Sequence, residues 1–276
     1  MESILIATDF SKSANNAAEY AARLGEQLSV KNLILYHSYE PVPQSVRVPE
    51  SNVLLEESIR ERNLKSLDEL KQELAVLTNG ETNIITVTDH FVLSHGINNL
   101  TKKYDIGLVV IGLSDKSLWE KILLGSSTKE IVSTCRLPLL VVPSSSRYTP
   151  IDKIVMGCDL KKVSTTVPAE KIRELVALLN AHLLAVHVDH DEEQYFDSDI
   201  IRQQYAFYDL FEDIEPSIAY VDDQDVNRGI LTYAEEQQAQ MILVVAKTRS
   251  FFERLTKESI SKKLATTSKF PLLIIH

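Results

Sequence analysis

The start of one helical segment in the first half of the chain has the residue types of a phosphate-binding site. Gly125, Ser126 and Ser127 precede this segment. Backbone N–H groups at a helix N-terminus, helped by a hydroxyl, bind phosphate oxygens. Ser127 with Glu130 also fits a capping box, in which the two side chains would satisfy the first N–H groups of the helix. Because a cap does not exclude a ligand, both interpretations are kept.

Two histidines stand at the ends of apolar runs, His37 in the first half of the chain and His187 in the second. A repeated histidine suggests catalysis, but no nucleophile or set of metal ligands lies beside either one in the sequence. The chain also has no GxxxxGK[ST], HExxH or GxSxG motif. We therefore expect both histidines to be structural, and we assign no catalytic residue and no metal ligand.

The histidines belong to a pattern that occurs twice. The run that ends at Asp9 reappears as the run that ends at Asp159, and His37 reappears as His187, both at an offset of 150 residues (159 − 9 and 187 − 37). A unit near half of the 276 residues is too long for a solenoid repeat. The sequence therefore predicts two domains in tandem.

The boundaries of these domains follow from the last apolar run of the first half. We place the first domain at 1–143 and the second at 151–276. Residues 144–150 form a short linker bracketed by Pro143 and Pro150, which is expected to keep the domains close together.

Each half alternates short, β-branched apolar runs with segments of helical spacing, which predicts a parallel sheet with helices on both faces. In the first half, strands are expected at 3–8, 33–39, 84–88, 106–111 and 137–142, and helices at 14–28, 53–77, 96–103 and 127–134. In the second half, strands are expected at 154–158, 183–188, 218–221, 241–246 and 272–275, and helices at 169–179, 227–237 and 259–268. An acidic stretch, 189–215, replaces the long helix, and its first five residues are interpreted as a solvated loop.

The fold class is therefore α/β, with two doubly wound, Rossmann-like domains of five parallel strands each. In such sheets, ligands bind beyond the carboxyl ends of the strands, where the strand order reverses. The residues at those ends are Thr8 and Asp9, His37 and Ser38, and the loop 112–127.

The composition excludes several classes of partner. The formal charge is −10, with 39 acidic against 29 basic residues spread over both halves, whereas a nucleic-acid partner requires a basic face. No apolar run approaches the ~18–20 residues of a membrane span, and no signal-peptide pattern opens the sequence, so we expect a cytoplasmic protein without a membrane partner. Cys135 and Cys158 lie in segments that do not correspond, and are expected to be buried thiols.

These features resemble the universal stress protein family in its tandem form. In that family, the nucleotide loop between the fourth strand and the last helix reads Gly, two residues, Gly, nine residues, Gly and then Ser or Thr. Gly112 matches the first glycine, Gly125 the last and Ser126 the hydroxyl. Pro138 opens the last strand as in the family, and Asp9 matches the acidic residue that closes the first strand. The resemblance covers nearly all of both halves and implies the adenine nucleotide alpha hydrolase-like form of the fold.

The resemblance implies a site for ATP or another adenine nucleotide, with Mg²⁺, in the first domain. The residues expected at this site are Thr8, Asp9, Ser38, Gly112, Asp115, Gly125, Ser126 and Ser127. Asp9 would contact a ribose or a bound metal; the alternative is that it caps the following helix, for which Ser11 competes. The backbone around Ser38 would contact the adenine.

The sequence departs from the family pattern in both copies. Asp115 replaces the middle glycine, so it adds bulk and negative charge where backbone N–H groups would approach a phosphate, which weakens binding. In the second copy all three glycines are gone, with Ala246, Arg249 and Glu258 in their places. We expect no nucleotide in that domain, and we expect Glu258 to occupy the phosphate position and to pair with Arg249.

The sequence is thus interpreted as a tandem universal stress protein, a stress-response regulator that binds an adenine nucleotide in its first domain without catalysis or with very slow hydrolysis. The alternative is a nucleotide-free protein-interaction scaffold in which both nucleotide sites have decayed. By the resemblance, the two domains form a pseudo-dimer through their last strands, 137–142 and 272–275. Whether the chain also forms a homodimer, and with which proteins it interacts, is left open.

Overall fold

The computed structural model describes residues 1–39, 49–113, 131, 135–189, 197–245 and 269–276. The described residues form two compact units, the first ending at Tyr148 and the second beginning at Thr149. Both units have the expected α/β fold, with five described strands in each, and the neighbouring strands within a unit are parallel.

The first unit is a doubly wound sheet with the strand order β3-β2-β1-β4-β5. Its elements, in chain order, are β1 (Ser3–Ala7), α1 (Lys12–Gln27), β2 (Asn32–Ser38), α2 (Pro49–Ala75), β3 (Asn83–Asp89), α3 (Leu93–Thr101), β4 (Ile106–Leu113) and β5 (Leu139–Pro143). The chain first builds outward from β1 to β2 and β3, and then returns to place β4 on the other side of β1. The strand order therefore reverses between β1 and β4, which is where a ligand site is expected.

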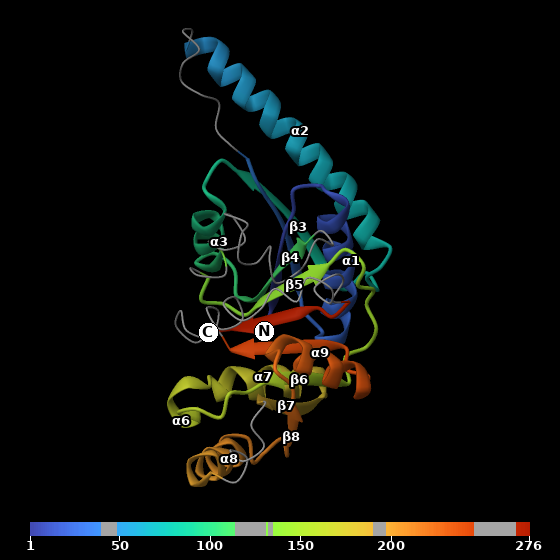
Figure 1. Cartoon of the computed structure of the whole chain (residues 1–276). Coiled ribbons are helices and arrows are strands. Elements are labelled where there is room, and N and C mark those ends of the chain that lie inside the picture. Colours follow the sequence, from blue (N-terminus) through green and yellow to red (C-terminus); the bar gives the residue numbers. More distant parts are fainter. Residues whose placement is uncertain (40–48, 114–130, 132–134, 190–196, 246–268) are drawn as a thin grey trace. The chain divides into compact units, whose positions relative to one another are not determined.

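Helices cover both faces of this sheet (Figure 1). A methyl group at Gly25 in α1 would lie 3.2 Å from Leu33, whereas one at Gly96 in α3 would overlap the Tyr36 hydroxyl. Leu33 and Tyr36 are an odd number of residues apart on β2, and therefore point to opposite faces. Helix α1 thus covers one face and α3 the other, and α2 contacts α1, β2 and β3.

The second part of the long helix α2 has a buried face. Asn63, Leu67, Leu70 and Leu74 are buried at the spacing of a single helix face, whereas Leu54 is 68% exposed. The helix starts at Pro49, four residues before the expected start, at a position where the missing N–H of proline costs nothing.

The beginning of the linker is fixed to the first unit. The Arg147 guanidinium donates to the Asn16 side-chain oxygen (2.6 Å), and the Tyr148 hydroxyl donates to Gln27 (2.7 Å), with both acceptors on α1. The Tyr148 ring also meets the Tyr20 ring edge-on, at 5.3 Å between the centroids.

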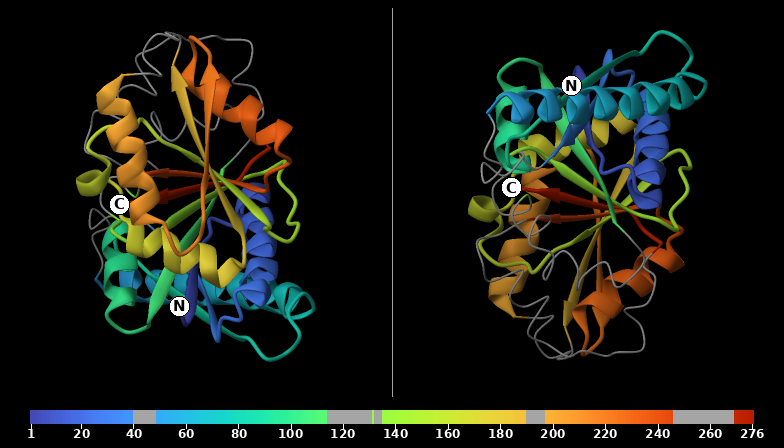
Figure 2. Two further views of the ribbon diagram at one scale, coloured as in Figure 1. Left: turned by 90° about the horizontal axis from the view of Figure 1, so that it is seen from below. Right: turned by 90° about the horizontal axis from the view of Figure 1, so that it is seen from above.

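The second unit repeats this winding, with the strand order β10-β9-β6-β7-β8. Its elements, in chain order, are β6 (Lys153–Gly157), α6 (Val163–Thr166), α7 (Ala169–Leu179), β7 (His182–Asp189), α8 (Ser198–Leu210), β8 (Ser217–Asp222), α9 (Val226–Glu236), β9 (Met241–Val245) and β10 (Leu272–Ile275). Helices α8 and α9 lie on opposite sides of the strands (Figure 2, left).

Two helices of the second unit were not expected from the sequence, the short α6 and the longer α8. Helix α8 lies within the acidic stretch 189–215 and is held by the buried side chains of Phe207 and, one residue beyond its end, Phe211. Asp189, expected in a loop, is the last residue of β7. Both cysteine thiols, Cys135 and Cys158, are buried as expected. No helix in the described ranges has the length and apolarity that crossing a membrane requires.

Candidate functional site

The first unit has a cavity of about 460 Å³ at the carboxyl ends of its strands. Its walls come from the ends of β1, β2 and β4, from the segment after β3 and from α1. The described residues that line it are Ala7, Thr8, Asp9, Ala14, Ser38, Tyr39, His90, Phe91, Val92, Leu93, Ile111, Gly112 and Ile131. The cavity thus spans the reversal of strand order between β1 and β4, and the structure brings Thr8, Asp9, Ser38 and Gly112 to its wall.

A tight turn after β1 presents Asp9 at the cavity. The Asp9 carboxylate accepts from the backbone N–H of Ser11 (2.9 Å), and the Thr8 hydroxyl accepts from the N–H of Phe10 (3.0 Å). Phe10 between them has a left-handed φ of 62°. The N-cap of α1 is Ser11, which accepts from the N–H of Ala14 (3.2 Å). Asp9 therefore holds the turn but does not cap the helix, which removes that alternative for its role.

The second unit builds the same turn. Asp159 accepts from the N–H of Lys161 (3.1 Å), and Leu160 between them has a φ of 47°. This shared turn gives a structural reason for an aspartate in both copies. A ligand contact by Asp9 would be an addition to that role.

The segment after β3 is tied to the end of β2 by hydrogen bonds. The Ser38 hydroxyl donates to the backbone oxygen of Phe91. The Asp89 carboxylate accepts from the Tyr36 hydroxyl (2.7 Å) and from the N–H of Phe91 (3.1 Å). Burial, followed by this bond to Asp89, raises the pKa of Tyr36. Ser38 thus positions the segment that carries Phe91, while the exposed Phe91 ring lines the cavity.

Aromatic rings gather along one side of the cavity. The His90 ring lies 5.5 Å from the Phe91 ring and 6.3 Å from the Tyr39 ring, measured between centroids. Val92, the N-cap residue of α3, makes no side-chain hydrogen bond to the first turn of that helix. This side therefore offers ring faces beside a helix start that lacks a side-chain cap.

Gly112, at the end of β4, is required by packing. A methyl group there would lie 2.3 Å from the Ser13 carbonyl oxygen and 2.7 Å from the Ala14 Cα. Both are backbone atoms, which cannot move aside as the end of a side chain can. The close approach of β4 to α1 is therefore enough by itself to explain a glycine at residue 112.

The repeated histidines both make a structural bond. His37 Nδ1 lies 2.8 Å from the carbonyl oxygen of Thr8, and His187 Nδ1 lies 2.9 Å from that of Cys158. Because a carbonyl oxygen can only accept, Nδ1 is the protonated nitrogen in both rings. Each histidine thus ties the end of its strand to the turn after the first strand of its unit.

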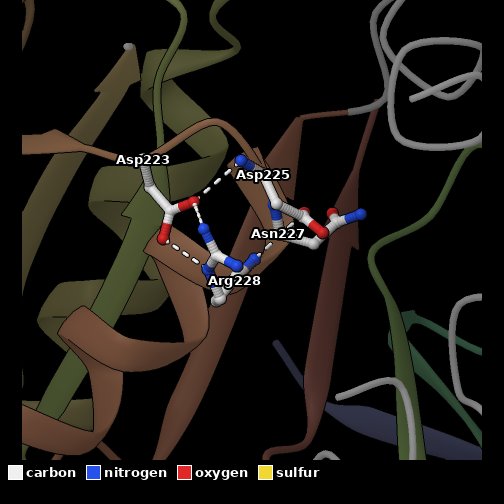
Figure 3. Close-up of polar contacts among 4 residues, drawn as sticks. All are labelled: Asp223, Asp225, Asn227 and Arg228. Atoms are coloured by element: carbon white, nitrogen blue, oxygen red, sulfur yellow. Dashed lines mark hydrogen bonds and ion pairs between the residues drawn. The ribbon is translucent and has the colours of Figure 1, made fainter. Parts of the chain in front are cut away.

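In the second unit, the segment between β8 and α9 is closed by its own side chains (Figure 3). Asp223 accepts from Arg228 Nε (2.7 Å) and Nη2, and from the N–H of Asp225 (2.8 Å). The hydrogen bond from Arg228 lowers the pKa of Asp223. Asp225 caps α9 by accepting from the N–H groups of Asn227 (3.0 Å) and Arg228 (3.3 Å). This helix start therefore has a side-chain cap, whereas the N-cap residue of α3 provides none.

Several predicted positions lie outside the described residues: Asp115, Gly125, Ser126 and Ser127 in the first copy, and Ala246, Arg249 and Glu258 in the second. No three His, Cys, Asp or Glu side chains gather as a metal site within the described ranges. The sequence reasoning missed the segment His90–Leu93. The signal available was its place after the third strand, whose carboxyl end shares an edge with those of β1, β2 and β4.

A doubly wound parallel sheet with a cavity where the strand order reverses defines the class of α/β proteins that bind their ligands at this edge. Within that class, the model of the universal stress protein family matches residues 1–143 and again 150–276. The chain belongs to the universal stress protein family, with two copies of its domain in tandem.

Two solved structures that span nearly the whole chain share this fold at low sequence identity. A universal stress protein from Archaeoglobus fulgidus is 15% identical with a TM-score of 0.69, and the alignment covers 99% of this chain and 97% of that one. A putative universal stress protein from Pseudomonas aeruginosa is also 15% identical, with a TM-score of 0.57 and coverage of 100% and 93%. A universal stress protein in complex with cAMP is 18% identical with a TM-score of 0.36, and covers 52% of this chain and 97% of its own.

Proposed function

We propose that the first unit binds an adenine nucleotide in the cavity at the ends of β1, β2 and β4, and that the chain acts as a regulatory protein of the stress response. The observation that carries this proposal is the cavity itself, which lies at the reversal of strand order and has Thr8, Asp9, Ser38 and Gly112 on its wall. Its volume of about 460 Å³ falls within the range of small-molecule sites.

The lining supports a ligand with a planar base and a sugar. Asp9 is exposed, and one of its oxygens accepts the N–H of Ser11, which leaves the other able to accept from a ribose hydroxyl. Ala7, Leu93 and Ile111 provide apolar wall, and the rings of His90 and Phe91 provide faces on which a base can stack. A nucleotide would bind as its magnesium complex. The metal ion would neutralise part of the negative charge of the phosphates, which this acidic chain would otherwise repel.

The hydroxyl groups of the lining support binding without rapid turnover. Thr8 accepts from a backbone N–H, and Ser38 donates to a backbone oxygen. In the described contacts, neither hydroxyl has a histidine or carboxylate partner that would activate it as a nucleophile. We accordingly place at most a slow hydrolysis in this site, and no nucleotide in the second unit.

Thermal unfolding of the full chain with and without Mg-ATP tests the proposal. A ligand that binds only the native state stabilises it by about 2.7 kcal/mol at a hundredfold excess over Kd. We expect a rise in Tm for the wild type, a larger one for Asp115→Gly, and a smaller one for Asp9→Ala. Asp159→Ala is the matched control, since it removes the equivalent aspartate from the second unit and should leave the rise unchanged.

The alternative is a nucleotide-free interaction scaffold, and it has its own expected result. If neither the wild type nor Asp115→Gly gains stability with Mg-ATP, the nucleotide proposal fails. One feature of the second unit, the outer face of α8, favours a role in protein interaction whichever way that experiment turns out.

A further inference from the structure

The region around α8 carries half of the net charge of the chain. Residues 197–215 contain six acidic residues and one basic residue, a net charge of −5 in a chain whose total is −10. The acidic residues are Asp197, Asp199, Asp209, Glu212, Asp213 and Glu215, and the basic residue is Arg202. An acidic field of this density favours association with a positively charged partner.

A stripe of apolar and aromatic side chains lies within this acidic region. Ile201 is 39% exposed, Tyr205 68% and Tyr208 36%. Their spacing of four and then three residues places them on one face of α8. We call these three residues the α8 stripe. Exposed apolar side chains that adjoin one another and are rimmed by charges are typical of a protein interaction site.

Other residues of α8 and its C-cap anchor the helix to the second unit, so the stripe is held in place. Phe207 and Phe211 are fully buried, with 4.8 Å between their ring centroids. Gln203 accepts from the N–H of Val163 (2.7 Å), and Gln204 accepts from the Tyr220 hydroxyl (2.9 Å). A helix fixed in this way loses little conformational entropy when a partner binds.

Not all of the carboxylates around the stripe are neutralised. Arg202 pairs with Asp199 (2.6 Å), and Arg173 pairs with Asp213 (3.5 Å). Asp197, Asp209 and Glu212 form no ion pair with any described residue. Asp197 is the N-cap residue of α8, one turn before Ile201, and Glu212 lies in the turn just beyond the C-terminal end of the helix, so these charges stand at the two ends of the stripe.

We propose that the α8 stripe is a docking surface for a basic amphipathic helix of another protein. The apolar face of that helix would pack on Ile201, Tyr205 and Tyr208, and its lysines or arginines would meet Asp197, Asp209 and Glu212. This is the complementary pattern that guides helix-to-helix recognition. A second copy of the chain does not fit, because it would bring the same acidic surface against this one. The proposal concerns the second unit alone and is independent of nucleotide binding in the first.

A synthetic peptide serves as the probe. We would label a helical peptide that has leucines at i, i+3, i+4 and i+7 and lysines elsewhere, and measure its binding to the full chain by fluorescence anisotropy at low and high salt. A peptide of the same composition in scrambled order is its control. We expect the amphipathic peptide to bind, to bind more weakly at high salt, and to be preferred over the scrambled one.

Variants locate the binding surface. Tyr205→Ser should weaken binding by about tenfold, as the loss of a central aromatic anchor does. Leu54→Ser is the matched control, because Leu54 on α2 is also 68% exposed and also stands among acidic residues. The double variant Asp209→Lys, Glu212→Lys should no longer bind the lysine peptide. It should instead bind a peptide in which glutamate replaces lysine. Unchanged Tm values would show that these exposed substitutions leave the fold intact.

Three results would overturn the proposal. The first is equal binding of the scrambled peptide, which would mean attraction by net charge alone. The second is an equal loss of affinity in Leu54→Ser and Tyr205→Ser. The third is the absence of binding by the amphipathic peptide at low salt.

Discussion

Gly112 on β4 and Ser13 on α1 meet backbone to backbone, so closely that a methyl group on residue 112 would lie 2.3 Å from the Ser13 carbonyl oxygen. The same glycine matches the first position of the family's nucleotide loop. A glycine at residue 112 can thus serve both the packing against α1 and the nucleotide loop. A substitution there disturbs the packing of α1 even when no ligand is bound.

Gly112→Ala should therefore destabilise the protein in the absence of nucleotide. Forcing a methyl group against fixed backbone typically costs about 1–3 kcal/mol, and we expect a loss of that order in urea unfolding. Gly80→Ala is the matched control, since residue 80 has a φ of 80° with open space around it, and its cost of about 1 kcal/mol would come from the backbone conformation alone. Equal stability of the wild type and Gly112→Ala would contradict the close approach of β4 to α1.

Gly96→Ala should destabilise the first unit through Tyr36. A methyl group at residue 96 would overlap the Tyr36 hydroxyl, which in turn donates to Asp89. Moving the tyrosine would break that partly buried bond, so we expect a loss of about 2–4 kcal/mol from overpacking together with a polar group that loses its partner.

A double-mutant cycle checks this mechanism. Tyr36→Leu removes the ring and destabilises the protein by itself, but it also removes the clash with a methyl group at residue 96. We therefore expect the double variant to be more stable than the sum of the two single losses predicts, by at least about 0.5 kcal/mol. Strict additivity would mean that Gly96 is required for a reason other than Tyr36.

Val92→Asp should raise stability and lower nucleotide affinity together. Val92 has the extended backbone of an N-cap residue (φ −56°, ψ 135°) but no side-chain bond to the start of α3. An aspartate there should cap the helix and gain about 0.5–1 kcal/mol. The same carboxylate would line the cavity and repel a phosphate-bearing ligand. Val92→Asn separates the two effects, because it caps without adding charge. A nucleotide affinity equal in Val92→Asp and Val92→Asn would argue against charge repulsion at this wall.

The strand ends of the site could be predicted from the sequence because a parallel sheet fixes their place. Once Ser3–Thr8 and Ile106–Ile111 are interpreted as buried strands, their carboxyl ends share one edge. Thr8 and Gly112 accordingly reach the same cavity. The role of Asp9 could be predicted less well from the sequence. Whether Asp9 or Ser11 caps α1 depends on the left-handed turn at Phe10.

Other parts depend on contacts that the sequence pattern does not encode. Phe91 lines the cavity because Ser38 and Asp89, from two neighbouring strands, hold its backbone. Helix α8 was missed because its buried positions are few and its surroundings are acidic. The spacing of Phe207 and Phe211 is helical, but two aromatic residues in such a stretch are a weak periodic signal.

The ion pair between Asp223 and Arg228 predicts a pH-dependent contribution to the stability of the second unit. The Asp223 side chain is only 13% exposed, and the guanidinium of Arg228 holds the pKa of its carboxyl below the ordinary value. A carboxyl whose pKa is lower in the folded than in the unfolded state stabilises the fold above its unfolded pKa of about 4. This contribution is lost as the pH falls through the folded pKa.

Arg228→Met should therefore lower the urea midpoint at neutral pH, because it leaves a largely buried carboxylate without its cation, and the difference from the wild type should shrink below about pH 4 as Asp223 is protonated. Arg202→Met is the matched control. The side chains of Arg202 and of its partner Asp199 are both more than 70% exposed, so we expect little change in the urea midpoint at any pH. Equal effects of the two variants at neutral pH would contradict a special role for Asp223. A difference that persists undiminished in acid would show that Arg228 acts by packing, because a packing contribution does not depend on the charge of its partner.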